Sequence, residues 1–399
     1  MTTTLNAAPC PPSVAGPKPE WWDGRSASWF TGRAVLLLAF HKMATLVVVL
    51  LGLAMLPIFN DARFEAVGQH WPETGGATWA TRFATWDAAH YLRLSIAGYE
   101  AGSPSCAFYP LLPLLIRLGA IFTLGHPVVA GMLLCNAASF AGLFLFFQLI
   151  KQTADSKTAF CSLLVLLSFP GAIFFSFIYT EPLFFLLAML FFHALFRKNH
   201  AALAVAGFLL PLTRAIGVFV VAPLAWHLFQ EGQLRKRWPV LLLPLAGYGS
   251  YFVVMLLFTG NPFEGFEAQN YFPNHPSVGN ILNVPGFMAS ITDARRLHGF
   301  TDSILDRLFF FIFVLSLPAL WTHQKTYFLY ALASGLVPAM SNWFFSYSRF
   351  VMMCFPLFLF LGARMAKATR PVPWCAGLVV MFSIQIIFLI RHINYYWAG

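Results

Sequence analysis

Side chains suited to group-transfer chemistry gather in one short stretch, from Thr85 to Tyr99. Asp87, His90 and Tyr91 stand at positions i, i+3 and i+4, so a helix would place them on one face, and Arg93 follows within one further turn. A carboxylate in this position can accept a proton from a hydroxyl nucleophile, and a guanidinium can hold a phosphate through paired hydrogen bonds. An interfacial amphipathic helix whose polar side chains reach toward water predicts the same pattern.

Three further charged residues lie at the ends of apolar segments. Glu181 opens one segment, Arg214 separates two short ones, and Arg349 opens another. Taken singly, each reads as a charge that favours a helix terminus or that snorkels to the membrane surface. Charges within a membrane are costly and usually face a cavity. Because the topology argued below puts all three on the same membrane face as Asp87, we predict that the four residues line one site.

Other polar residues carry weaker signals. Arg117 is the charge within an apolar run at 107–124, and Gln269 could contact a sugar, although a turn followed by a short amphipathic helix explains its segment equally well. Lys42 lies in the first apolar run, where it either snorkels toward the cytoplasm or binds a lipid phosphate. Neither HExxH, a Walker A loop nor GxSxG occurs, and the six cysteines are scattered, so we expect no cofactor and no protein-built metal site.

The composition places these residues in a membrane protein. Hydrophobic residues make up 59% of the 399 and charged residues 10%, whereas a soluble domain carries about a quarter of its residues as charges. The formal net charge of +10 is spread singly or in short clusters between apolar runs, which is typical of cytoplasmic loops and not of a nucleic-acid surface. We therefore expect an all-α polytopic protein whose partner is the lipid bilayer and not nucleic acid.

Positive charges in the connections fix the predicted topology. The basic connections near 151–157, 197–198, 235–237, 325 and 364–370 all fall in the cytoplasm only if the run at 107–124 does not cross. That run holds Pro110, Pro113 and Arg117, so we read it as a juxtamembrane or re-entrant helix. About eleven transmembrane helices remain, each near the usual length of roughly 20 residues or shorter. They are predicted at 34–58, 127–150, 158–175, 177–196, 201–212, 215–229, 238–258, 304–322, 326–345, 347–363 and 373–391.

The same topology divides the chain into a tail and one membrane domain. Residues 1–33 are predicted to be a cytoplasmic tail, and 34–399 a single transmembrane domain. Both long polar segments, 59–126 and 259–303, then become outer loops, the first carrying juxtamembrane helices. The short spans on either side of Arg214 indicate a broken backbone that lines a cavity, since unpaired peptide groups are not tolerated against lipid.

Several segments together resemble a known family. Trp86-Asp87-x-x-His90-Tyr91 and the stretch from Phe108 to Arg117 resemble the first lumenal loop of PIG-V-type mannosyltransferases, of which bacterial members are known. The segments that also match the family are Tyr179-Thr180-Glu181-Pro182, Thr213-Arg214-x-x-Gly217, Ser348-Arg349-Phe350 and Phe355-Pro356. The resemblance covers roughly residues 35–365. The family motif commonly reads Trp-Asp-Gly with a tryptophan two places on, whereas Ala88 and His90 stand here, so the pocket beside the aspartate differs.

The resemblance implies a GT-C-type glycosyltransferase fold. Such enzymes take a sugar from a polyprenyl-phosphate carrier on the lumenal or periplasmic side, and an acidic residue of the first outer loop, here Asp87, serves as catalytic acid or base. The hypothesis is an inverting transfer of a hexose, mannose first, to a hydroxyl of a glycolipid, a glycan or a protein. The substrate would be bound by His90, Tyr91, Arg93, Arg117, Glu181, Arg214, Gln269 and Arg349.

Two other functions compete with this hypothesis. A transporter or lipid flippase predicts paired polar residues near the membrane midplane and an inverted repeat, and the sequence shows neither. A non-catalytic scaffold that has kept the fold is the second alternative. The expected location is a bacterial inner membrane, with a cytoplasmic N-terminus and a periplasmic site, or the endoplasmic reticulum in a eukaryote.

Overall fold

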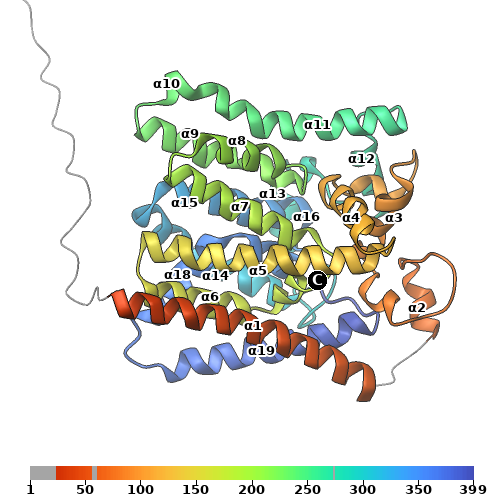
Figure 1. The fold of residues 1–399 in the computed structure, drawn as a ribbon, viewed down its shortest axis with the longest axis horizontal. Helices are drawn as coiled ribbons and strands as arrows, with labels where there is room; N and C mark the ends of the chain where they lie inside the picture. Colours follow the sequence, from red (N-terminus) through yellow and green to blue (C-terminus); the bar gives the residue numbers. More distant parts are fainter. Residues whose placement is uncertain (1–23, 56–60, 273–274) are drawn as a thin grey trace, which may run out of the picture.

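The computed structural model describes residues 24–55, 61–272 and 275–399, and over these residues the protein is a bundle of helices (Figure 1). Within that part of the chain the extended pairings are two isolated bridges, and no strand forms. Of the expected cytoplasmic tail at 1–33, residues 1–23 lie outside the described residues, and residues 24–33 belong to the first helix, which begins at Gly24. The predicted all-α class is confirmed for what the structure describes.

Five helices among the described residues are long and apolar enough to cross a membrane, and a sixth crossing follows if one bent pair counts as a span. They are α1 (Gly24–Met55), α5 (Pro127–Thr153), α11 (Leu242–Thr259, preceded by α10, Leu234–Arg237, and η5, Trp238–Leu241), α14 (Ile304–His323) and α19 (Val372–Ile393). The bent pair joins α17 (Tyr347–Phe350) and η9 (Val351–Met353) to α18 (Phe355–Ala366) at 81°. The chain is therefore a multi-pass membrane protein.

Shorter helices fill the other predicted spans. They are α6 (Ser156–Ser168), α7 (Thr180–Phe196), α8 (His200–Leu209), η4 (Ala215–Val220), α9 (Val221–Gln230), α15 (Lys325–Ala331), η8 (Leu332–Leu336) and α16 (Val337–Asn342). The helix within 107–124 is α4 (Leu111–Phe122), whose 12 residues span about 18 Å against a hydrocarbon core of about 30 Å. Its length agrees with a juxtamembrane helix that does not cross.

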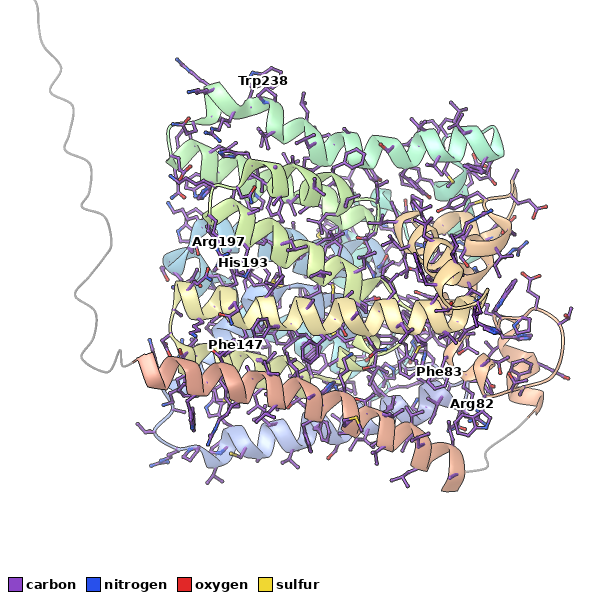
Figure 2. All side chains as sticks on the ribbon, in the orientation of Figure 1. Arg82, Phe83, Phe147, His193, Arg197 and Trp238 are labelled. Atoms are coloured by element: carbon purple, nitrogen blue, oxygen red, sulfur yellow. The ribbon has the colours of Figure 1, made fainter. Side chains whose placement is uncertain are left out.

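The helices α2, α3 and α4 of the first polar segment and α12 of the second gather at one end of the bundle, called here the loop end (Figure 1). The first segment forms α2 (Asp61–Val67), η1 (Ala80–Phe83), α3 (Asp87–Ala97), η2 (Pro104–Ala107) and α4. The second forms α12 (Glu264–Glu267), η6 (Ala268–Tyr271), η7 (Val278–Leu282) and α13 (Val284–Thr292). Figure 2 shows Arg82 and Phe83 at the loop end, and Arg197 and Trp238 at the opposite end.

The two polar segments are joined by buried hydrogen bonds. The carboxylate of Glu264 accepts the backbone N–H of Gly102 at 2.6 Å, and from the neighbouring helix α11 the Tyr251 hydroxyl donates to the carbonyl of Cys106 at 2.7 Å. Glu264 is buried, so its charge is matched by a specific donor and not by water. The second polar segment therefore packs through α12 and η6 against η2, which in turn contacts α3.

Close helix packing holds the bundle behind the loop end. α5 packs along α7, and α6 packs along α18. A Cβ on Gly362 would lie 2.5 Å from backbone atoms of Ser162, so glycine alone permits the α6–α18 approach. Small residues at such contacts are typical of membrane helices, which associate through close packing. Large apolar side chains such as Phe40, Leu257 and Leu315 remain exposed and provide the surface that contacts lipid.

Candidate active site

Four of the predicted site residues form one chain of ion pairs at the loop end. Arg349 contacts Asp87 through Nη1 at 2.7 Å and donates from Nε to Glu181 Oε1. Arg214 reaches the same Glu181 oxygen at 2.5 Å and donates to the Thr180 hydroxyl at 3.1 Å. This cluster, called here the Asp87–Arg349 network, has a fully buried carboxylate in Glu181 and an accessible one in Asp87, whose side chain is 22% exposed.

The helix α3 presents Asp87 to this network. Asp87 is its first residue, where the helix dipole favours a negative charge. The preceding residue, Trp86, holds a left-handed φ of 56°, which is unfavourable for a tryptophan and turns the chain sharply into the helix. One turn later, the Tyr91 hydroxyl lies 3.3 Å from the Thr180 hydroxyl. The face carrying Asp87 and Tyr91 therefore points at the start of α7.

His90 lies beside that face and contacts a different environment. Its Nδ1 lies 2.9 Å from the Ser105 hydroxyl, and its ring stacks on Phe108 with centroids 4.4 Å apart. Arg93 is half-exposed and pairs with Glu73 and Glu100, each at 3.4 Å. The structure therefore joins Asp87 and Tyr91 to the network, while the imidazole and the Arg93 guanidinium are engaged elsewhere.

The two remaining predicted residues lie outside the network. Arg117 is exposed on α4, and Gln269 is half-buried in η6, which packs against η2. No hydrogen bond or ion pair joins either side chain to the described residues of the network. Their roles in binding stay predictions.

Glu181 is positioned by a break in the backbone. The predicted span at 158–175 is not one helix: α6 ends at Ser168, and η3 (Pro170–Phe175) follows before α7 starts at Thr180. Pro170 explains the end of α6, because the residue before a proline avoids the helical conformation and proline offers no N–H. A Cβ on Gly171 would lie 2.6 Å from the Ser348 carbonyl, so this glycine lets the break approach the segment that carries Arg349.

Lys42 stabilises this break from within α1, which corrects both expectations for that residue. Its ammonium donates to the carbonyl of Phe175 at 2.7 Å, to the hydroxyl of Ser176 at 3.2 Å and to the side-chain oxygen of Asn136 at 3.0 Å. It neither snorkels to an end of the bundle nor stands ready for a lipid phosphate. A backbone carbonyl that is outside a helix and inside a membrane protein needs a hydrogen-bond donor from the protein itself. Lys42 is that donor for Phe175, which lies five residues before Thr180.

Arg349 is positioned by a second break in the backbone. The sequence predicts one continuous span at 326–345, whereas the helix α16 ends at Asn342. Trp343, Phe344 and Ser346 all have positive φ values, of 46°, 66° and 58°. Such conformations persist only where surrounding packing enforces them, and they concentrate at functional sites. The buried carboxylate of Asp306 accepts the backbone N–H of Ser348 at 2.6 Å and so anchors the turn that delivers Arg349.

Sequence reasoning missed Asp306, although it left a signal. Ser303 caps α14 by accepting the N–H of Asp306, so an acid stands in the first turn of a helix that follows a long loop. An acid there is ordinarily explained by the helix dipole alone. Nothing in the sequence pairs it with Ser348, which lies 42 residues further along the chain.

A narrow pocket lies against the network, and Arg349 lines it together with Trp86, Tyr179, His392 and Trp397. Within the part of the chain that the structure describes, several buried polar atoms around it have no hydrogen-bond partner, namely Trp86 Nε1, Glu181 Oε2, Ser346 Oγ and Trp397 Nε1. Buried polar atoms in folded proteins are nearly always satisfied, so a group of unsatisfied ones marks a place where a ligand or water completes the set. Among the described residues, no three His, Cys, Asp or Glu side chains gather as a metal site requires.

A larger apolar groove of about 520 Å³ opens beside this region. Its walls include Trp71, Trp79, Phe83, Met132 and Leu133, so it lies between the first polar segment and the loop end of α5. Phe83 stacks on Phe177, whose ring lies 4.4 Å from His392 at the pocket. A layer of aromatic rings thus separates the groove from the pocket.

The environment of His90 predicts an acid-sensitive fold. Burial lowers the pKa of His90 from its ordinary value of 6.5 to about 4, and the Asp87 carboxylate offsets part of that shift. Between pH 6.5 and 4 the unfolded chain binds the proton and the folded chain does not, so stability is lost as the pH falls through this window. The loss is about 3 kcal/mol once the pH reaches the lower value.

We expect His90→Asn to flatten this dependence, because the asparagine oxygen can replace Nδ1 opposite Ser105 without gaining a proton. The measurement is the unfolding temperature in detergent between pH 4 and 7.5, with His275→Asn, a change at an exposed histidine, as control. Equal acid sensitivity of wild type and His90→Asn would contradict the assignment.

Comparison with known proteins identifies the family. The model of the family described as mannosyltransferase (PIG-V) matches residues 38–238, half of the chain, and so includes Asp87, Glu181 and Arg214. Arg349 lies beyond the matched residues and is tied to them by its ion pairs with Asp87 and Glu181. No curated protein matches the chain. The resemblance drawn from the sequence is confirmed, and the chain belongs to the PIG-V family of mannosyltransferases, which makes it a membrane glycosyltransferase with a sugar donor and an acceptor as substrates.

Proposed function

We propose that this protein transfers a hexose, mannose first among candidates, from a polyprenyl-phosphate carrier to an acceptor hydroxyl, with inversion at the anomeric carbon. The reaction takes place at the loop end, which faces the periplasm of a bacterium or the lumen of the endoplasmic reticulum. The observation that carries the proposal is the contact of 2.7 Å between the partly exposed Asp87 carboxylate and Arg349, at the edge of a pocket that Arg349 also lines.

Each reacting group then has a counterpart in the site. Asp87 accepts the proton of the acceptor hydroxyl while the oxygen of that hydroxyl forms a bond to the anomeric carbon. The bond between that carbon and the phosphate oxygen breaks, and the electron pair leaves with the polyprenyl phosphate. Arg349, supported by Arg214, stabilises the charge of the leaving phosphate, and preorganised cations are most effective in such a buried setting.

Glu181 holds the two arginines in place. Their charges would repel one another in a buried site, and the single Glu181 oxygen that both contact offsets this repulsion. The Thr180 and Tyr91 hydroxyls complete the wall next to Arg214. Tyr91 does not act as the base in this mechanism, because burial raises the pKa of its phenol well above the ordinary value.

The apolar groove supports a lipid-linked substrate. Val129 and Leu133 on α5 are exposed at its rim, so the groove opens onto the surface that contacts lipid. An isoprenoid chain in the bilayer can enter it sideways and leave its phosphate near the loop end. Arg93, Arg117 and Gln269, which lie in the surrounding loops, are then placed to contact the sugar or the acceptor.

The architecture proposed with this function is a GT-C-type fold of about eleven spans. The broken helices on either side of Arg214, Thr180 and Arg349 are counted as spans in this topology, with their breaks lining the site. Charges crowded at one end of the bundle favour a transferase over a transporter, whose binding residues lie near the midplane.

The test is sugar transfer by the purified protein in liposomes. Polyprenyl phosphate carrying radiolabelled mannose is supplied with octyl mannoside as a simple acceptor, and with membranes of the source organism as the natural one. We expect a labelled product that is absent with heat-treated protein, with the anomeric configuration inverted. Movement of the labelled lipid across the bilayer without any glycosylated product would instead indicate a flippase.

A further inference from the structure

We propose that Trp397, in the segment that follows α19, contacts the polyprenyl-phosphate sugar. Its indole N–H donates a hydrogen bond to an oxygen of this substrate and so determines the affinity of the protein for it. The inference rests on the proposed function, since the donor is the ligand named there. It assigns a role to residues 394–398, which lie far from the part of the chain that the family match covers.

The segment 394–398 is held firmly over the loop end. Arg82 donates from Nη1 to the carbonyl of Ile393 at 3.0 Å and to the side chain of Asn394 at 3.2 Å, and Figure 2 shows Arg82 at this end of the bundle. The hydroxyls of Thr81 and Tyr395 lie 2.9 Å apart. Both Arg82 and Tyr395 are buried, so the segment is part of the folded core and not a loose end.

The ring of Trp397 is the point where four segments meet. Its centroid lies 5.2 Å from Trp86, next to the proposed base, and 5.1 Å from Phe300 of the second polar segment. Phe345, in the break before Arg349, lies 5.0 Å away. Arg391 fixes the backbone by donating to the Trp397 carbonyl at 3.0 Å. The Trp397 ring therefore packs against both segments that position the site residues: Trp86 before Asp87, and Phe345 before Arg349.

Packing explains the burial of the ring but leaves its N–H unexplained. Trp397 is 8% exposed, and its Nε1 has no hydrogen-bond partner among the described residues. An indole can only donate, so the missing partner is an acceptor. A buried donor without a partner is destabilising, and a phenylalanine at this position would avoid that cost.

The pocket next to Trp397 supplies the rest of the argument. Arg349 and Trp86, whose indole N–H is equally unpaired among the described residues, line the same pocket, so three side chains that carry N–H donors border one small space. Such a set fits a ligand rich in accepting oxygens, which a phosphate diester and the hydroxyls of a hexose both provide. Arg349 adds the positive charge that a phosphate requires. The geometry therefore assigns the pocket to the phosphate and sugar oxygens of the polyprenyl-phosphate sugar.

The experiment removes the N–H and keeps the ring. Trp397→Phe is compared with a variant that carries the isosteric benzothiophene in place of the Trp397 indole, and Trp238→Phe at the opposite end of the bundle is the matched control. The readouts are the unfolding temperature, the Kd of polyprenyl phosphate with and without mannose, and KM and kcat for transfer. We expect Kd and KM to rise about tenfold in both Trp397 variants, because a hydrogen bond to a charged group is lost, with kcat changed less.

The outcomes separate this inference from the proposed function. If wild type transfers sugar while the benzothiophene variant keeps wild-type Kd and KM, the inference is wrong and the transferase function stands. If wild type binds polyprenyl phosphate but transfers nothing, the function fails and the Kd ratio still decides the role of Trp397. A wild type that binds neither lipid overturns the inference. A Kd effect confined to the mannose-bearing lipid assigns the N–H to a sugar hydroxyl, and an effect on both lipids assigns it to the phosphate.

Discussion

Asp87→Asn is expected to lower the rate of sugar transfer by about two to four orders of magnitude, the range that a positioned general base contributes. The amide keeps the size and position of the carboxylate but cannot accept the proton of the acceptor hydroxyl. The fold should survive, because Asp87 is the accessible end of the network and Arg349 keeps its contact with the buried Glu181. The measurement is kcat for transfer of radiolabelled mannose in liposomes, alongside the unfolding temperature.

The matched control is Asp293→Asn, the same change at a half-exposed aspartate of the second polar segment that pairs with Arg295. It should leave both the rate and the unfolding temperature unchanged. The role of Asp87 as base is wrong if Asp87→Asn transfers sugar as fast as wild type. A loss of rate with a matching loss of folded protein would likewise remove the support for a chemical role.

Glu181→Gln is expected to have the largest effect on stability. Its carboxylate is fully buried between Arg214 and Arg349, and the amide leaves Arg214 without a compensating charge and Arg349 with the partly exposed Asp87 alone. Removing one partner of a buried ion pair costs about 3–5 kcal/mol, since the remaining charge stays desolvated. We therefore expect a marked fall in the unfolding temperature. The measurement is intrinsic tryptophan fluorescence on heating in detergent.

Glu267→Gln provides the comparison, because it makes the same change at an exposed carboxylate whose partner is the Asn261 amide. Removing Arg214 together with Glu181, as Arg214→Gln with Glu181→Gln, should recover part of the lost stability, since one unpaired charge disappears. Contacting side chains are expected to couple in this way. An unfolding temperature for Glu181→Gln equal to that of Glu267→Gln would show that the network is not a buried electrostatic unit.

The breaks in the helices link these two predictions. Asp87 depends on the turn at Trp86, Glu181 on the break held by Lys42, and Arg349 on the turn anchored by Asp306. Lys42 and Asp306 each lie on a different helix from the residue they position, whereas Trp86 directly precedes Asp87 at the start of α3. The site is therefore assembled by packing of the whole bundle, and damage to a distant support should weaken the network without touching a substrate.

The sequence by itself determined the class of the protein and the neighbourhood of its site. Apolar runs too numerous for a soluble surface required a helical membrane protein, and the spacing from Trp86 to Tyr99 placed Asp87 on a helix in the first polar segment. These features are local, because hydrophobicity and helical periodicity depend on neighbours in the chain. The number of spans and the orientation in the membrane remain predictions from the distribution of positive charge.

Only the tertiary structure decided which side chains meet. The expected face of Asp87, His90 and Tyr91 is divided, since His90 stacks on Phe108 while Asp87 contacts Arg349, which lies 262 positions further along the chain. The breaks after Ser168 and at Trp343, and the return of Trp397 to the pocket, leave no periodic signal in the sequence. Their conformations are unfavourable locally and are enforced by long-range packing and buried charge, which a single sequence does not reveal.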